Sequence, residues 1–156
     1  MNKRDPINST DDDARALAGA ILRDARFGAL AVSHPDTGHP YVARVAMLWT
    51  DGALHTLIST LSTHTKALAN DPHCAALLGE PGDKGDPLTH PRLTVSAKAA
   101  TIDKAALKSA WLGAIPKAQL YYDFADFQMV RLQVLSVDLN GGFGKAYQLT
   151  ADDLPL

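Results

Sequence analysis

The spacing of apolar residues changes its period several times along the chain, and each change predicts a new element. An apolar stripe at every third or fourth position predicts an amphipathic helix over 11–25, where Thr10 and three aspartates resemble a capping box. Short apolar runs bounded by Gly, Pro and Asp predict strands over 28–33, 40–50, 53–58, 73–79, 92–102, 128–139 and 146–149. Helical spacing also predicts three further helices over 63–70, 107–115 and 117–124.

Two local patterns sharpen this prediction. Asp51-Gly52 between two apolar runs is typical of a tight hairpin turn. The last long strand is apolar at Val130, Leu132 and Val134, and then changes phase at Leu135. Either a bulge or a strand buried on both faces explains this change.

Helices and strands do not alternate strictly, which argues against a doubly wound parallel sheet. The order of elements predicts a mainly β (α+β) fold, an antiparallel barrel with peripheral helices. We expect residues 1–10 to be flexible and residues 11–156 to form a single domain.

Composition narrows the classes of partner and compartment. The formal net charge is −2 over 156 residues, and this value does not favour nucleic acid as a partner. No apolar run reaches the roughly 20 residues of a membrane helix. The first residues lack the apolar stretch of a secretory signal, and Cys74 cannot form an internal disulfide, so we expect a cytoplasmic protein without a membrane partner. The six histidines lack metal-ligand spacing, so we expect no metal site.

The segment Leu57–Ala67 is the first candidate for chemistry. An apolar strand runs into a dense group of Ser and Thr hydroxyls, and a helix begins at Thr63 or His64 with Lys66 in its first turn. Backbone N–H groups, hydroxyls and a lysine at a helix start favour a bound phosphate. The alternative is that these Ser and Thr residues are ordinary helix caps.

Two arginines are further candidates. Arg44 lies mid-strand among apolar neighbours, so its charge needs either a carboxylate partner or a ligand anion. Arg92 opens a strand and is either a solvated strand end or a ligand contact. Because no nucleophile motif is present, a cofactor would carry the chemistry if the protein is an enzyme.

The order of nine short motifs, over roughly residues 12–150, carries a resemblance to a known family. These are Gly28-Ala-Leu-Ala-Val, Pro40–Trp49, Asp51-Gly-Ala-Leu, Leu61-Ser-Thr-His-Thr-Lys-Ala-Leu, Asn70-Asp-Pro, Asp86-Pro-Leu, Pro91-Arg-Leu-Thr-Val, Tyr121-Tyr-Asp-Phe-Ala-Asp-Phe and Gly141-Gly-Phe-Gly-Lys-Ala. The chain resembles the pyridoxamine 5′-phosphate oxidase-like flavoproteins, which are built on an FMN-binding split β-barrel of about six strands. It is most similar to the branch related to haem-utilisation proteins.

The resemblance implies FMN at the interface of a homodimer. It implies that Arg44, Val45 and Ala46 line the flavin and that Ser59 contacts the ribityl phosphate region. It also implies that His64, Thr65 and Lys66 hold the phosphate and that Arg92 contacts the flavin from the fifth strand. The implied function is an FMN-dependent oxidoreductase whose substrate the sequence does not name.

Departures from the family pattern leave alternatives open. The oxidases carry a lysine where Leu48-Trp49 stands, and their substrate-gripping Tyr, Arg and Ser are missing from residues 111–119, so we expect no pyridoxamine-phosphate oxidase activity. Some haem-utilisation relatives ligate haem through a late histidine, whereas the last histidine here is His90. The alternatives are a haem-binding or haem-degrading protein and a non-enzymatic FMN-binding module.

Overall fold

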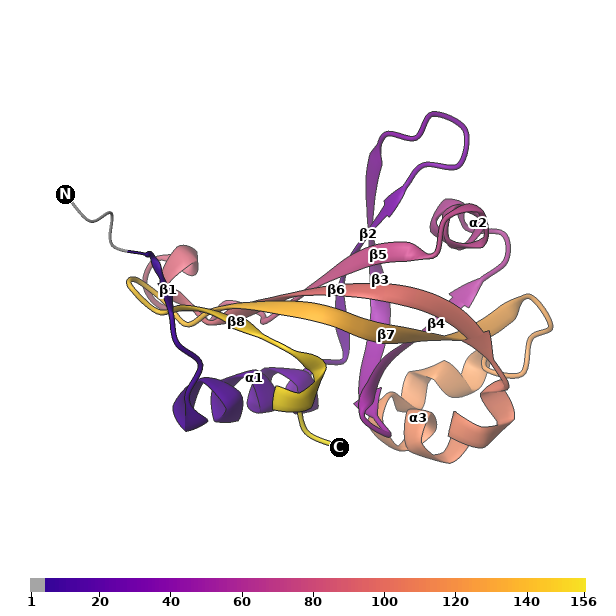
Figure 1. The fold of residues 1–156 in the computed structure, drawn as a ribbon. Helices are drawn as coiled ribbons and strands as arrows, with labels where there is room; N and C mark the ends of the chain where they lie inside the picture. The colour runs from indigo at the N-terminus through magenta and orange to yellow at the C-terminus, as the bar shows by residue number, and fades with distance from the viewer. Residues whose placement is uncertain (1–4) are drawn as a thin grey trace.

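Six of the eight strands in the computed structural model, which describes residues 5–156, close into a barrel (Figure 1). The strands are β1 (Ile7–Asn8), β2 (Phe27–Ser33), β3 (Pro40–Thr50), β4 (Ala53–Ser59), β5 (His73–Leu78), β6 (Arg92–Ile102), β7 (Phe127–Asn140) and β8 (Ala146–Leu149). Their order is β1-β8-β7-β4-β3-β2-β5-β6, and β6 pairs back with β7 to close the ring. All pairings within the barrel are antiparallel, as predicted.

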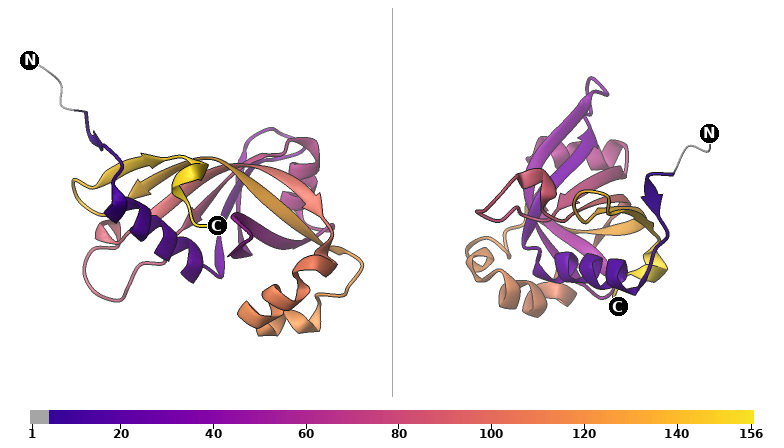
Figure 2. Two further views of the ribbon diagram at one scale, coloured as in Figure 1. Left: turned by 60° about the horizontal axis from the view of Figure 1, so that its bottom comes forward. Right: turned by 90° about the vertical axis from the view of Figure 1, so that its left-hand side faces the viewer.

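The helices lie around this barrel. They are α1 (Asp12–Asp24), α2 (Thr63–Asn70) and α3 (Lys108–Ala114), with 3-10 turns η1 (Pro87–Thr89), η2 (Lys104–Leu107), η3 (Pro116–Leu120) and η4 (Ala151–Asp153). Figure 2 shows α1 and the α3 segment at different places on the barrel, with the C-terminus beside α1. α2 follows β4 and packs against β2 and β3.

Apolar residues form two packed clusters. The inward faces of the strands fill the barrel with side chains such as Leu30, Met47 and Leu132, and α1 adds Leu22 to them. On the outside, α3 and η3 cover a second cluster in which Trp111 packs with residues of β3, β4 and β7. Burial of these aliphatic and aromatic side chains supplies the main driving force for the fold.

Two predicted details are confirmed. Asp51 and Gly52 both have positive φ, at 52° and 65°, which is the backbone of a two-residue type I′ hairpin. The β6–β7 register shifts because Ser96 pairs with Ser136 while Ala97 pairs with Val134, which leaves Leu135 as the extra residue of a bulge. The bulge explains the phase change in the sequence.

Other details differ from the sequence prediction. The cap of α1 is Asp11, whose side chain accepts from the Ala14 N–H, whereas the Thr10 hydroxyl donates to the Gln148 carbonyl. The helix expected over 117–124 is a short 3-10 turn that begins at Pro116. Of the segment expected to be flexible, residues 1–4 lie outside the described residues, while Ile7 and Asn8 pair with β8.

Candidate cofactor site

A pocket of about 600 Å³ lies between α1 and the outer face of the barrel. Its floor comes from β2, β3 and β5, one wall from α1, and the other from residues around Glu80 and Pro91. The lining residues are Leu17, Ala20, Ile21, Asp24, Ala25, Arg26, Phe27, Gly28, Ala29, Arg44, Leu77, Gly79, Glu80, Pro81 and Pro91. Most of these side chains are apolar, so the pocket suits a ligand with a large apolar surface.

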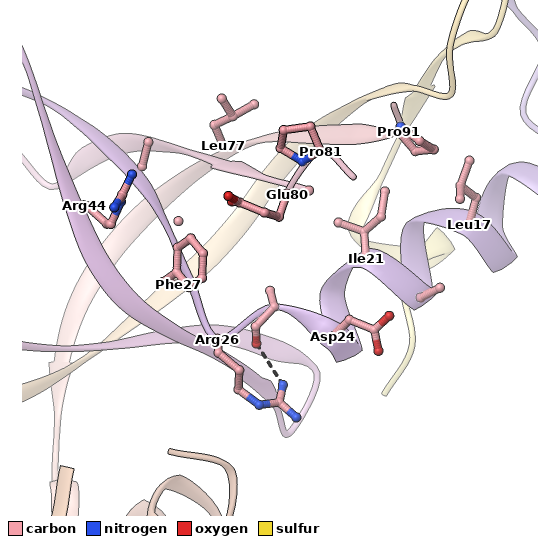
Figure 3. A pocket seen from close by; sticks show the side chains of 15 residues that line it. Leu17, Ile21, Asp24, Arg26, Phe27, Arg44, Leu77, Glu80, Pro81 and Pro91 are labelled. Atoms are coloured by element: carbon pink, nitrogen blue, oxygen red, sulfur yellow. Dashed lines mark hydrogen bonds between the residues drawn. The ribbon is translucent and has the colours of Figure 1, made fainter. Parts of the chain in front are cut away.

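Arg44 stands at one end of the pocket (Figure 3). Its guanidinium carbon lies 5.8 Å from the centroid of the Phe27 ring, a cation–π contact. The sequence suggested a buried charge that needs a partner, but Arg44 is exposed on the outer face of β3. No carboxylate lies within ion-pair distance of Arg44 in residues 5–156. Its guanidinium is therefore available to an anionic group of a ligand.

Val45 and Ala46 follow Arg44 but face opposite ways. Val45 is buried in the barrel core, whereas Ala46 shares the outer face with Arg44. The Ala46 carbonyl accepts a hydrogen bond from the Thr56 hydroxyl at 2.7 Å. A ligand on the outer face can therefore touch the Ala46 side chain, but only the backbone of Val45.

The predicted phosphate segment forms the link between β4 and α2. In the described residues, Ser62 occupies the N-cap position of α2 without a side-chain hydrogen bond to the helix. The capping alternative therefore fails at this position, and the first backbone N–H groups of α2 keep no side-chain partner there. A helix start of this kind attracts anions, and the exposed Lys66 adds a positive charge.

Two of the predicted phosphate ligands are already engaged. The Ser59 hydroxyl donates to the Asp126 carboxylate at 2.7 Å, and the buried Thr65 hydroxyl donates to the Ser59 carbonyl at 2.5 Å. These bonds hold the start of α2 against the end of β4. His64 is half-buried, and burial lowers its pKa, so its imidazole is neutral at pH 7. Of the predicted phosphate ligands, Lys66 is thus the one cationic group, and it lies in the first turn of α2 beside the uncapped backbone N–H groups.

Arg92 lies elsewhere. It lines a second, smaller pocket of about 360 Å³ between β6, β7 and β8, together with Thr94 and Asp138. Its Nη1 donates to the Leu88 carbonyl at 2.9 Å and, more weakly, to the His90 carbonyl at 3.4 Å. Of the eight residues predicted to bind a cofactor, only Arg44 is among those that line the larger pocket.

Arg44 and the segment that leads to α2 both lie just beyond the place where strands β3 and β4 separate. Their pairing ends at Met47 with Thr56, and three residues further along each strand stand Arg44 and Ser59. From there β3 pairs with β2, while β4 pairs with β7. α2 packs against β2 and β3 and so closes this opening with its buried Ala67 and Leu68.

Sequence reasoning missed the α1 wall of the pocket, which includes Leu17, Ile21 and Asp24. Their helical spacing was visible, but spacing alone does not say which surface a helix faces. In residues 5–156, no group of three or more His, Cys, Asp or Glu side chains is arranged to hold a metal ion. Within the same residues, no helix is long and apolar enough to span a membrane.

Comparisons with known proteins show which of them share this sequence and fold. No family model matches the chain. The atypical chloroplastic heme oxygenase HOZ of Arabidopsis thaliana is 34% identical over 101 residues, which are 62% of this chain and 30% of that protein. The structure of a heme binding protein from Mycobacterium smegmatis is 28% identical, with a TM-score of 0.84 over 92% of this chain and 60% of its own.

A third similarity concerns the fold. A candidate pyridoxamine 5′-phosphate oxidase from Listeria innocua superposes with a TM-score of 0.66 at 16% identity, over 82% of this chain and 98% of its own. This chain has the split-barrel fold of the pyridoxamine 5′-phosphate oxidase-like proteins. Its sequence similarity lies with the haem-related proteins of that fold. The resemblance drawn from the sequence is thus confirmed, although the chain spans only about a third of HOZ and three-fifths of the M. smegmatis protein.

Proposed function

We propose that this chain binds a flat cofactor with anionic side groups in the pocket beside Arg44, and that the cofactor is haem. The observation that carries the proposal is the exposed Arg44 guanidinium at the rim of an apolar pocket of about 600 Å³. Both relatives at 28% and 34% identity are named for haem, which supports this choice over other flat ligands.

The pocket fits the ring and the carboxylates of haem. Phe27, Ala29 and Leu77 offer apolar contact to a flat ring, and Arg44 offers charge-assisted hydrogen bonds to a carboxylate. Among the described lining residues there is no His, Cys, Met or Tyr, so an iron ligand would have to come from outside this lining. Bound haem would supply the redox chemistry of its iron, while the chain binds and orients the ring.

The proposal includes a homodimer with the cofactor at its interface. The outer face of β2, β3 and β5 leaves Phe27 44%, Val42 62% and Leu77 47% exposed, with alanines between them in register. An apolar sheet face of this kind is typical of a surface that a partner covers. Phe27 and Leu77 also line the pocket, so a second copy on this face would close the cofactor site.

FMN is the second candidate, and a separate observation favours it. The uncapped start of α2 with Lys66 suits a phosphate, which FMN carries and haem lacks. The Thr65–Ser59 hydrogen bond would hold these backbone N–H groups in place. In this case the protein would be a flavoprotein oxidoreductase or, without turnover, an FMN-binding module. A cytoplasmic location remains part of the proposal for either cofactor.

One experiment separates the two cofactors. The purified protein is mixed with haemin or with FMN, desalted, and examined by visible absorption. A sharpened Soret band that stays with the protein supports haem, and retained flavin bands support FMN. Retention of neither would contradict the cofactor proposal. Decay of the bound Soret band once a reductant and oxygen are supplied would extend haem binding to haem degradation.

The variant Arg44→Ala tests whether the exposed Arg44 guanidinium contributes to haem binding. We expect haem affinity to fall roughly ten- to a hundredfold, because an Arg–carboxylate hydrogen bond contributes about 1.5–3 kcal/mol. Arg15→Ala is the matched control, since Arg15 is a surface arginine outside the pocket lining, paired with Asp12 and Asp153. Equal affinities of the two variants would show that haem does not use Arg44.

A further inference from the structure

The loop between β5 and β6 forms one wall of the cofactor pocket, through Glu80, Pro81 and Pro91. Its two ends touch at Gly79, which has φ of 105°, and a Cβ built there would lie 2.5 Å from the Pro91 carbonyl oxygen. This close approach makes residues 79–91 a loop with a narrow neck. Contacts within the loop therefore hold this wall of the pocket in place.

The His90 imidazole contacts the backbone of the loop at two points. Its Nδ1 accepts a hydrogen bond from the Gly82 N–H at 2.7 Å, and its Nε2 lies 2.7 Å from the Lys84 carbonyl oxygen. A backbone N–H can only donate and a carbonyl can only accept. The geometry therefore requires a neutral imidazole with its proton on Nε2. Asp86 adds a turn in the same loop by accepting from the Leu88 N–H.

We propose that the neutral His90 imidazole holds this loop closed, and that its protonation opens the wall of the pocket and speeds cofactor release. A proton on Nδ1 removes the acceptor of the Gly82 N–H. The Nδ1–H and the Gly82 N–H then face each other and repel. The Lys84 contact survives, because Nε2 keeps its proton. The release step rests on the proposed cofactor site, whereas the loop opening does not.

Charged residues near His90 come from three elements. They are Glu80, Asp83, Lys84 and Asp86 in the same loop, Arg92 at the start of β6, and Lys145 in the β7–β8 hairpin, whose Gly142 approaches Thr89. In the described chain no carboxylate forms an ion pair with the His90 ring. Arg92 donates to the His90 backbone carbonyl at 3.4 Å, so a positive charge contacts the backbone of the same residue.

The first test uses the protein without cofactor. Across a pH series, NMR follows the protonation of the His90 ring and the solvent exchange of the Gly82 amide. After correction for the intrinsic pH dependence of exchange, we expect Gly82 protection to fall at least roughly fivefold, in step with His90 protonation, as for the loss of one hydrogen bond. Protection that does not follow His90 overturns the proposal.

Two variants and a control sharpen this test. His90→Gln keeps one acceptor and one donor, so we expect Gly82 protection that no longer depends on pH. His90→Ala removes both, so protection should be low at every pH. His73→Gln is the control, because His73 is an exposed histidine outside the loop that pairs with Asp71. A pH response lost in the His73 variant, or kept in His90→Gln, contradicts the role of His90.

The second test measures release of haem or FMN, whichever the protein retains, by stopped-flow transfer to an apoprotein acceptor. We expect the dissociation rate of wild type to rise several-fold as His90 becomes protonated, and that of His90→Gln to stay level. Loop opening without faster release would refute the regulatory step alone. Failure to retain either cofactor would refute the proposed function and leave the result on the loop intact.

Discussion

Single residues decide how firmly the pocket walls are held. Gly79 has a positive φ and lies against the backbone of Pro91 and Arg92, so the neck of the loop tolerates no side chain there. Arg44, by contrast, was singled out in the sequence for its charge, and the role that we propose for it depends on its exposure. The first residue belongs to the backbone geometry of the site, and the second to its chemistry.

Gly79→Ala should lower the free energy of unfolding by roughly 1–3 kcal/mol, because the added Cβ would meet backbone atoms at a strained φ. Thermal or urea denaturation measures the change. Gly113→Ala is the matched control, since a Cβ there meets nothing within 4 Å and alanine favours helix. Equal stability of the two variants would mean that the neck of the loop adapts to a side chain.

His55 gives the fold a pH dependence. It is 1% exposed, and burial, followed by the nearby Arg131 charge, lowers its pKa in the folded state. The unfolded chain therefore binds a proton at a higher pH than the folded chain does. Above the unfolded pKa of about 6.5, His55 is neutral in both states and the folding free energy is unaffected by its protonation. As pH falls below that value, the unfolded chain takes up a proton more readily than the folded chain, so the protein loses stability.

His55→Leu should remove part of that loss. We expect wild type to lose on the order of 1 kcal/mol more stability than the variant between pH 7.5 and pH 5.5, measured by urea unfolding. The half-buried His64 acts in the same direction, so it is left unchanged in both proteins. Parallel pH profiles of the two proteins would show that His55 does not titrate on unfolding.

At the scale of elements, the start of α2 is where local sequence and tertiary structure combine. The hydroxyl-rich segment was visible in the sequence, but its hydroxyls are divided between tasks. Thr65 and Ser59 hold α2 to β4, and the helix start remains uncapped by Ser62. The bulge at Leu135 is a similar case, because the sequence showed a phase change and the β6–β7 register showed its cause.

Lys66→Ala should weaken FMN binding several-fold and leave haem binding unchanged, because only FMN carries a phosphate for the α2 start. Fluorescence titration with FMN and absorption titration with haemin measure the two affinities. Lys117→Ala serves as control, since Lys117 is an exposed lysine on η3. An equal loss of FMN affinity in both variants would reduce the role of Lys66 to general surface charge.

At the scale of the whole molecule, one face of the barrel is less polar than a water-facing sheet. Alternation along β2 and β3 buries one set of side chains in the barrel and leaves Phe27, Val42 and the alanines outside. α3 covers the neighbouring part of the outer surface, including Leu48 and Leu57. The uncovered part is the face on which we propose that a second copy packs.

Val42→Glu should shift the protein from dimer to monomer, because it places a charge in the middle of that apolar face. Sedimentation velocity measures the mass, and Val42 is exposed enough for the monomer to keep its stability. Leu135→Glu is the control at the bulge of β7, where Leu135 is 54% exposed. A monomeric wild type, or a dimeric Val42→Glu variant, would contradict the proposed interface.

The sequence by itself determined strands β2 to β8, the three α-helices, the Asp51–Gly52 hairpin and the antiparallel barrel, but not β1, because hydrophobic period and turn residues act over a few neighbouring positions. It also pointed to Arg44 and to the α2 start. Only the tertiary structure decided that Arg44 is exposed beside Phe27, that Arg92 lines a different pocket, and that α1 forms a wall of the pocket beside Arg44. These facts depend on contacts between residues far apart in the chain, and local spacing carries no information about such contacts.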